Sequence, residues 1–175
     1  MTVRLHTGDP SLYGAIREQM DRLDELGIKY DICPGVSSFC GAAAALRAEY
    51  TLPDVSQTVI ITRMAGRTPV PEKESIAALA AHNATMVIFL STGFLKELSA
   101  ELIRGGYKPD TPAAIVYKAS WADQKVCRCT VEDLAQTASD NGITKTALIC
   151  VGYFLGNDYS LSKLYDKSFE TEFRK

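Results

Sequence analysis

The sequence predicts an α/β layered fold, with a mostly parallel sheet in its first part and a mixed sheet in its second part. Short apolar runs with the length of strands alternate with segments whose apolar residues recur at helical spacing. Turns of small residues follow the first two apolar runs, as strand-to-helix turns do in parallel α/β units. The side chains of residues 124–130 are expected to alternate between the two faces of a strand, and this strand is expected to pair antiparallel with its neighbour.

The first part of the chain is predicted to run strand, helix, strand, helix. The predicted strands are residues 3–6 and 29–33, and the predicted helices are residues 12–26 and 39–48. Gly27 is expected to end the first helix. The turns at residues 7–10 and 34–38 join each strand to the helix that follows it.

The second part begins after a break near residues 50–55, so we expect domains at residues 1–52 and 53–175. Its predicted strands are residues 58–64, 86–90, 113–118, 124–130 and 146–154, and its predicted helices are residues 72–81, 95–104 and 131–139. A loop rich in Gly and Pro, residues 65–71, follows the first of these strands. Such a loop at a strand end is typical of an active-site segment.

Composition narrows the classes of function. The formal net charge of −2 provides no basic field, so we expect neither nucleic acid nor a membrane surface as a partner. The apolar stretches are too short to span a bilayer, and no signal peptide opens the sequence. The odd number of cysteines, 5, argues against a disulfide framework. We therefore expect a cytoplasmic protein with reduced thiols.

The two early turns are the strongest candidates for a binding site. Parallel strands bring such turns to one edge of the sheet, where a ligand cleft is expected. Gly8 permits close backbone approach, and Asp9 offers a carboxylate to hydroxyls or an ammonium group. Ser37 and Ser38 place hydroxyls and free amides at a helix start, which suits a carboxylate. The alternative is that Asp9 and Ser37 are only helix caps.

Other chemistry receives less support from the sequence. Dinucleotide-binding and P-loop glycine patterns are absent, as is the nucleophile elbow of hydrolases. Cys127 and Cys129 are spaced too closely for a zinc site, so no metal is expected. His6 adjoins the first turn. The basic residues at or just after strand ends, which can meet substrate carboxylates or only serve solubility, are Arg63, Arg67 and Lys118.

Several strings resemble the tetrapyrrole methylase family. Residues 7–14 (TGDPSLYG) look like its central motif, and residues 34–38 (PGVSS) look like its next loop, in the same order and at a similar separation. Residues 62–72 (TRMAGRTPVPE) and 160–166 (SLSKLYD) resemble the branch that methylates C11 of precorrin-4. The likeness extends over nearly the whole chain.

This resemblance implies a two-domain α/β protein, a homodimer, that holds S-adenosylmethionine between its domains. Carried over by motif, the cofactor contacts are Gly8, Asp9, Leu12, Ser37, Ser38, Met64 and Ser91. Arg67 is the expected contact to a carboxylate of the corrinoid substrate. The implied reaction transfers the sulfonium methyl group to C11 of precorrin-4 or cobalt-precorrin-4. The resemblance identifies no catalytic base.

One departure from the family pattern concerns the first domain. Family members begin with a strand, a Gly-Pro-Gly turn and further helices, whereas the sequence here begins almost at the Thr7-Gly8-Asp9 motif. We therefore expect a truncated parallel N-terminal α/β domain, in which residues 3–6 are an exposed or re-paired strand. Two alternatives stay open. In the first alternative, the chain is another methyltransferase of the same family. In the second, it is a non-catalytic fragment that binds a corrinoid or a nucleotide.

Overall fold

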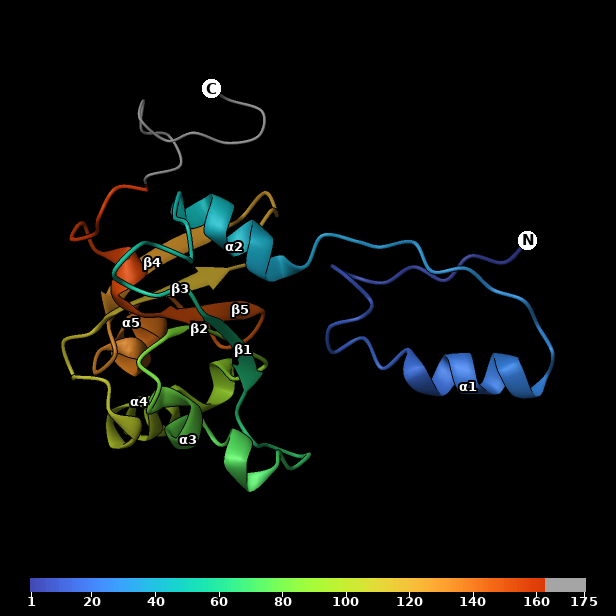
Figure 1. Cartoon of the computed structure of the whole chain (residues 1–175), viewed down its shortest axis with the longest axis horizontal. Helices are drawn as coiled ribbons and strands as arrows, with labels where there is room; N and C mark the ends of the chain where they lie inside the picture. Colours follow the sequence, from blue (N-terminus) through green and yellow to red (C-terminus); the bar gives the residue numbers. More distant parts are fainter. Residues whose placement is uncertain (163–175) are drawn as a thin grey trace.

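The structure, a computed structural model, describes residues 1–162 and is built around a five-stranded sheet (Figure 1). The strand order is β1-β2-β5-β3-β4. The bounds are β1 Val59–Arg63, β2 Thr85–Phe89, β3 Pro112–Tyr117, β4 Lys125–Thr130 and β5 Ala147–Val151. The strands are short and rich in apolar or β-branched residues, as buried strands usually are. All five strands expected in the second part are therefore present.

The direction of the strands determines which loops can meet. β1 and β2 run parallel, whereas β5 is antiparallel to β2 and β3, and β4 is antiparallel to β3. The carboxyl ends of β1, β2 and β3 therefore share one edge of the sheet with the amino ends of β4 and β5. We call this edge the site edge. The mixed sheet confirms the predicted α/β class and the antiparallel pairing of residues 124–130, whereas the described structure has no strand before β1, where a parallel sheet was expected.

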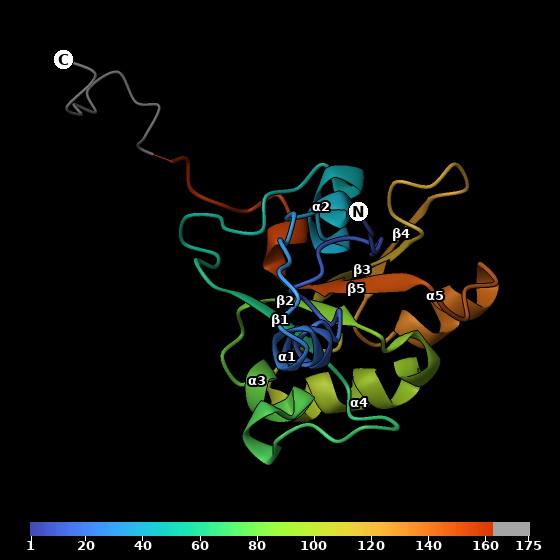
Figure 2. The ribbon, with the colours of Figure 1, turned by 90° about the vertical axis from the view of Figure 1, so that its right-hand side faces the viewer.

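Alternating side chains divide the interior into two cores, one on each face of the sheet. Met86 and Ile88 of β2 face one core, and Val87 faces the other. The first core lies under α3 Ile76–Ala80, α4 Leu95–Gly105 and α5 Leu134–Asp140. The second lies under α2 Ser38–Leu46 and the 3-10 turn η3 Tyr153–Leu155. Figure 2 shows α2 on one side of the sheet and α3 and α4 on the other.

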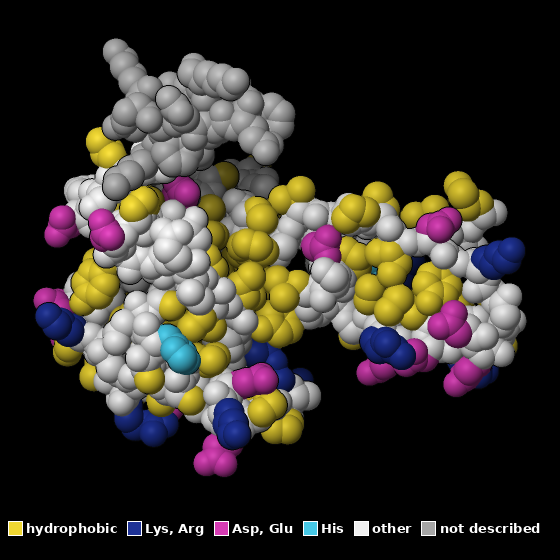
Figure 3. All heavy atoms as spheres, viewed as in Figure 1, with side chains coloured by type: hydrophobic (Ala, Val, Ile, Leu, Met, Phe, Trp, Pro, Cys, Tyr) yellow, Lys and Arg dark blue, Asp and Glu magenta, His cyan; other side chains and the backbone are white. Residues whose placement is uncertain are grey.

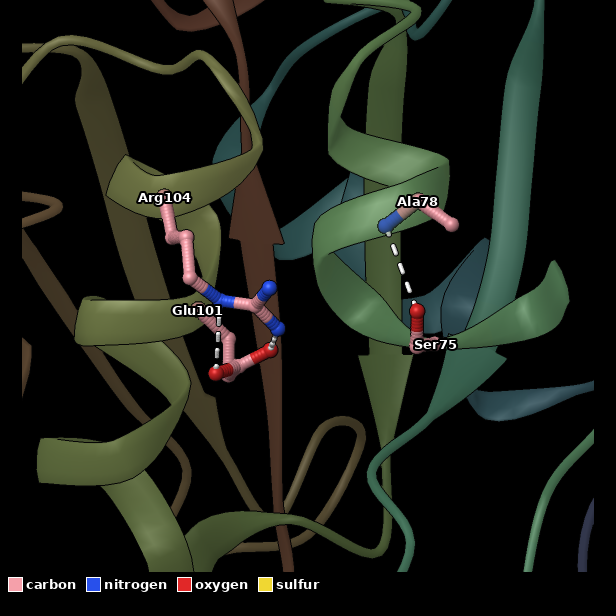
Figure 4. A network of polar contacts seen from close by, with 4 residues as sticks. All are labelled: Ser75, Ala78, Glu101 and Arg104. Carbon is pink, nitrogen blue, oxygen red and sulfur yellow. Dashed lines mark hydrogen bonds and ion pairs between the residues drawn. The ribbon is translucent and has the colours of Figure 1, made fainter. Parts of the chain in front are cut away.

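Two short 3-10 turns, η1 Glu72–Glu74 and η2 Thr92–Phe94, precede α3 and α4. Helices α3 and α4 pack closely because Gly105 has no side chain: a Cβ there would lie 2.4 Å from the Ala77 carbonyl oxygen. The Ser75 hydroxyl caps α3 by accepting a hydrogen bond from the Ala78 amide at 3.4 Å (Figure 4). The predicted helix of residues 72–81 is therefore interrupted, since Ser75 is extended, with ψ of 150°.

Arg128 of β4 fixes the position of α2 on the sheet. Its guanidinium donates to the carbonyl oxygens of Leu46, the last residue of α2, and Leu155, both at 3.0 Å. These bonds satisfy carbonyl groups that a helix end leaves unpaired. The Tyr50 hydroxyl donates to the Phe39 carbonyl oxygen at 2.7 Å, near the other end of α2. The start of α2 is thereby held against the sheet, close to the site edge.

Residues 1–36, which we call the N-terminal arm, mostly extend away from the sheet (Figures 1 and 3), although the Tyr13 ring contacts Phe89 of β2. The arm contains α1 Arg17–Glu25, which has no buried residue. The strands expected at residues 3–6 and 29–33 are absent, which corrects the prediction. A strand is stable only beside a partner, and the described residues supply none to either segment. The large apolar side chains left exposed there include Val3, Leu5, Ile28 and Ile32.

Two further boundaries differ from the expectation. The first helix begins at Arg17 rather than residue 12, because Tyr13 and Ala15 adopt left-handed φ angles of 56° and 49°. The last strand ends at Val151, since Gly152 adopts a φ of 140° and the chain then turns into η3. The proposed division after residue 52 stays a prediction. Within residues 1–162, no helix has the length and apolar character needed to cross a membrane.

Alkaline pH should destabilise the fold through Cys150. Burial raises the pKa of this thiol from its ordinary value of 9.0 to about 12, so the folded state keeps it protonated. Its contribution to stability is complete below pH 9.0 and is lost as the pH rises toward 12. The free energy of unfolding should fall by about 1.4 kcal/mol per pH unit for this group. Urea denaturation at a series of pH values measures this slope.

Two cysteine variants separate the contribution of Cys150 to the pH dependence from that of other groups that titrate at alkaline pH. Cys150→Ala should flatten the pH dependence, whereas Cys33→Ala should not, because Cys33 is exposed. An unchanged slope in Cys150→Ala would show that the buried thiol is not responsible.

Candidate functional site

A cavity of about 510 Å³ opens at the site edge. The N-terminal arm and the start of α2 form one wall, to which Gly8, Asp9, Leu12, Ser37 and Ser38 contribute. The ends of β2 and β3 and the start of β5 form the other, with Phe89, Leu90, Val116 and Ala147. The two turns that were expected to converge therefore do so. The volume lies in the range that holds one cofactor or drug-sized ligand.

Asp9 joins the two turns. We call residues 7–14 the first loop and residues 34–38 the second loop. The Asp9 carboxylate accepts hydrogen bonds from the amide and the hydroxyl of Ser11 within the first loop. Its other oxygen accepts the Gly35 amide of the second loop at 2.8 Å. These bonds lower the pKa of Asp9 below its ordinary value, and the bond from the Ser11 hydroxyl has the largest effect. The carboxylate therefore stays ionised at neutral pH.

The backbones of the two loops approach so closely that only glycine fits. A Cβ on Gly35 would lie 2.0 Å from the Gly8 carbonyl oxygen and 3.2 Å from the Asp9 Cα. Real Cβ atoms do not approach backbone oxygens this closely. Gly8 itself adopts a φ of 71°, which glycine accepts without strain. The backbone at Gly8 and Asp9 therefore packs directly against Gly35, so the first and second loops form one joint structure.

The start of α2 contributes Ser37 and Ser38 to the cavity wall. Ser37 precedes the helix, yet its hydroxyl makes no capping hydrogen bond. Asp9 caps no helix either, because α1 begins at Arg17. The interpretation as a helix cap is therefore wrong for Asp9, whereas Ser37 does occupy the N-cap position of α2, without a bond from its hydroxyl. Amides of the first helical turn have no partner within a helix, and together with the helix dipole they attract an anionic group such as a carboxylate.

A comparison with known protein families shows to which family the chain belongs. Residues 1–135 match the family model described as Tetrapyrrole (Corrin/Porphyrin) Methylases, a span that includes both loops and most of the sheet. The chain belongs to the tetrapyrrole methylase family.

Individual tetrapyrrole methylases resemble the chain over most of its length. The cobalt-precorrin-4 C(11)-methyltransferase of Methanocaldococcus jannaschii is 57% identical over 99% of the chain. A solved structure of a cobalt precorrin-4 methyltransferase of cobalamin biosynthesis superposes with a TM-score of 0.87 at 50% identity, over 90% of the chain. The uroporphyrin-III C-methyl transferase of Thermus thermophilus, solved with S-adenyl homocysteine, has a TM-score of 0.68 over 85% of the chain. At 20% identity, it supports the fold alone.

These matches confirm the family and the fold class that the motifs predicted. The chain spans about two thirds of the length of these proteins: 67% of the archaeal relative, 66% of the first structure and 64% of the second. The string at residues 160–166 lies partly outside the described residues, from Lys163 onward.

Two residues that tetrapyrrole methylase motifs assigned to the cofactor, Met64 and Ser91, lie at the site edge but do not line the cavity. The Ser91 hydroxyl accepts the Met64 amide at 2.9 Å and donates to the Phe89 carbonyl oxygen at 2.7 Å. Ser91 is fully buried. In this geometry Ser91 joins the ends of β1 and β2 and fixes the positions of Met64 and Phe89.

The basic residues of the loop after β1 have different positions. Arg67 is exposed and lies outside the cavity lining. Arg63 instead organises the loop, because its guanidinium donates to the carbonyl oxygens of Met64, Thr68 and Pro69 at 2.9–3.2 Å. The third basic candidate, Lys118, does line the cavity.

The remaining candidates are divided between cavity and surface. His6 lines the cavity, as its place beside the first turn suggested. The other histidine of the sequence, His82, is exposed on the body of the protein. Burial raises the pKa of Cys129 to about 11, so it remains a protonated thiol at neutral pH. Among residues 1–162, no group of three or more potential ligands could hold a metal ion.

Sequence reasoning missed several residues of the cavity wall. Tyr13, Leu90, Trp121 and Thr146 line it, and three of them adopt left-handed φ angles: Tyr13 at 56°, Leu90 at 53° and Thr146 at 59°. Such backbone strain costs about 1–3 kcal/mol per residue and gathers at functional sites. Tyr13 lies within the family motif and contacts the Phe89 ring at 5.3 Å between centroids. For Leu90 and Thr146 the sequence signal was only their position beside strand ends.

Gly35→Ala should separate the two loops. The new methyl group would collide with the Gly8 carbonyl oxygen, so the Asp9 carboxylate would lose the amide of residue 35. The hydrogen-bonded amides of Ser11, Leu12 and residue 35 should then exchange hydrogen about tenfold faster or more, which corresponds to a local opening free energy lower by about 1.4 kcal/mol. Hydrogen exchange followed by mass spectrometry measures this.

Gly93→Ala is the matched control, since a Cβ there meets nothing within 4 Å. It should leave exchange in both loops unchanged. Equal exchange in Gly35→Ala and the wild type would contradict the close loop contact.

Proposed function

We propose that this chain transfers the methyl group of S-adenosylmethionine to C11 of precorrin-4 or cobalt-precorrin-4, a reaction of cobalamin biosynthesis. The observation that carries the proposal is the joint structure of the first and second loops at one wall of the cavity. The 57% identity to a cobalt-precorrin-4 C(11)-methyltransferase supports the choice of substrate. Within the family, this favours the corrin branch over the other methyltransferases.

The residues of the first wall fit S-adenosylmethionine. Gly8 lines the cavity, and Gly35 has no side chain that would separate the first loop from the second. The amides at Ser37 and Ser38 suit the carboxylate of the amino acid moiety, and Asp9 is ionised and can accept from hydroxyl or ammonium groups. Leu12 adds apolar surface to the same wall. These residues, with Met64 and Ser91 at the neighbouring strand ends, are our proposed cofactor site.

When bound, S-adenosylmethionine supplies an already activated methyl group. The work of the protein is then to align the two reactants and to exclude water. Strained backbone positions give the cavity walls a fixed shape, which suits the alignment of two reactants. These positions are Tyr13, Leu90 and Thr146. Arg67 remains our proposed contact to a substrate carboxylate, from an exposed loop at the site edge.

We further propose that the protein acts in the cytoplasm as a homodimer and binds no nucleic acid. The free state of Cys33, Cys40, Cys127, Cys129 and Cys150 supports a reducing compartment. Exposed apolar side chains on the N-terminal arm support association with a second copy. Light scattering coupled to size-exclusion chromatography tests the dimer, and a monomeric mass at micromolar concentration would refute it.

Asp9→Ala should weaken binding of S-adenosylhomocysteine, the stable product form of the cofactor. The substitution removes the acceptor that joins the two loops, so their contacts to the ligand lose alignment. We expect the dissociation constant to rise about tenfold, equivalent to about 1.4 kcal/mol. Isothermal calorimetry measures it, with the exposed Asp110→Ala as a control that should match the wild type. An unchanged affinity in Asp9→Ala would refute its role.

The reaction itself is tested by incubation with methyl-labelled S-adenosylmethionine and cobalt-precorrin-4. The proposal predicts a methylated corrinoid whose new label lies at C11, identified by NMR. Retention of both ligands without transfer would instead favour the binding-fragment alternative.

A further inference from the structure

The loop after β1 leaves the sheet at the site edge and borders the cavity (Figure 1). Arg63, the last residue of β1, is the register partner of Phe89 in β2, and Phe89 lines the cavity. A Cβ on Gly66 of the loop would lie 3.5 Å from the Phe94 ring. The loop therefore packs against η2, whose first residue, Thr92, is also part of the cavity wall.

The Arg63 guanidinium holds this loop in one shape. Its Nη1 donates to the carbonyl oxygens of Met64 at 3.1 Å and Thr68 at 3.2 Å, and its Nη2 donates to that of Pro69 at 2.9 Å. One planar group thus ties the start of the loop to its returning half. Such a contact needs N–H donors on separate nitrogens at fixed angles, whereas an ammonium group donates from a single nitrogen.

Arg67 lies at the tip of the turn that Arg63 closes. The Gly66 amide donates to the Thr68 carbonyl oxygen at 3.2 Å, so the chain reverses direction around Arg67. Pro69 limits the backbone further, because its ring fixes its own φ and restricts the residue before it. The Arg67 side chain is exposed, and among the described residues no hydrogen bond or ion pair occupies its guanidinium.

A free guanidinium on a fixed turn suits the binding of a carboxylate. The turn is already ordered, so only the side chain loses conformational freedom when a ligand binds. A guanidinium can donate two parallel hydrogen bonds to one carboxylate, and a corrin precursor carries acetate and propionate groups. Arg63 differs from Arg67 because three of its donor bonds are directed to the loop itself.

We propose that Arg63 is a positioning residue for the methyl acceptor, because it fixes the turn that presents Arg67 to a carboxylate of the corrinoid. This inference rests on the proposed function, in which Arg67 is the substrate contact. It places the bound carboxylate outside the cavity of about 510 Å³, which is left to the cofactor.

Binding of the cofactor should not depend on Arg63. The Met64 amide is held by the Ser91 hydroxyl at 2.9 Å, and the pairing of β1 with β2 extends as far as Arg63. Both contacts involve the backbone of β1 and remain when the guanidinium is removed. The affinity for S-adenosylhomocysteine therefore reports whether a variant is folded and keeps its cofactor site.

A double-mutant cycle tests whether Arg63 acts through Arg67. Uroporphyrin is the probe, since it is a stable tetrapyrrole with acetate and propionate groups, and calorimetry gives its dissociation constant. Arg63→Met and Arg67→Met should each raise this constant about tenfold. The double variant should stay within twofold of Arg67→Met, because both changes remove the same contact. With cobalt-precorrin-4, KM should follow the same pattern while kcat stays nearly constant.

Further measurements separate positioning from direct contact and from a loss of stability. Arg63→Lys keeps the charge but not the planar fork, so it should recover little of the affinity, and it replaces Arg63→Met in the cycle if that variant does not fold. The Gly66 amide should exchange hydrogen faster in Arg63→Met but not in Arg67→Met. Arg104→Met, on the exposed face of α4, is the matched charge control and should behave as the wild type.

Several results would overturn the inference. Losses that multiply in the double variant would show that the two arginines act independently, and full recovery in Arg63→Lys would show that the charge of Arg63 meets the ligand directly. Weaker binding of S-adenosylhomocysteine in Arg63→Met would place its role at the cofactor. Absence of uroporphyrin binding to the wild type would also contradict the inference.

Failure of the inference and failure of the proposed function give different results. If the wild type methylates cobalt-precorrin-4 and Arg63→Met keeps its KM, the inference fails and the proposed function stands. If uroporphyrin binding shows the coupled losses but no methyl group is transferred, the proposed function fails and the positioning role stands.

Discussion

The Asp9 carboxylate links two loops that are 26 residues apart along the chain, and the geometry of the cavity follows from this link. Its hydrogen bond to the Gly35 amide requires the Gly35 backbone to rest against the Gly8 carbonyl oxygen, which excludes any side chain at position 35. The second loop then leads directly into α2, whose start is held on the sheet by Tyr50. One carboxylate and one glycine therefore fix the position of the second loop and of the start of α2 at the cavity.

The sheet contributes the other wall through its mixed strand directions. Because β5 is antiparallel to β2 and β3, the start of β5 lies beside the ends of its two neighbours, and Ala147 joins Phe89 and Val116 around one cavity. Strained backbone at Leu90, Lys118 and Thr146 marks the same edge. The cavity is thus enclosed by rigid elements on one side and by the paired loops on the other, an arrangement suited to aligning two reactants.

Periodicity and turn residues predicted the second part of the fold well, since each of its strands is paired within the sheet. They failed for residues 3–6 and 29–33, because a β pattern records a preference for a sheet and cannot supply the partner strand. The motif residues Gly8, Asp9, Leu12, Ser37 and Ser38 were placed correctly on one cavity. Trp121 and Leu90 were not foreseen as cavity residues, since the strained backbone at Leu90 and Ser120 leaves no clear pattern in the sequence.

A crystal structure of the chain with S-adenosylhomocysteine tests the central claim most directly. The account predicts ligand density between the first and second loops, with the ligand carboxylate at the start of α2 and the bond from the Gly35 amide to Asp9 intact. Density for the ligand elsewhere on the molecule, or loops that have moved apart around it, would contradict the account.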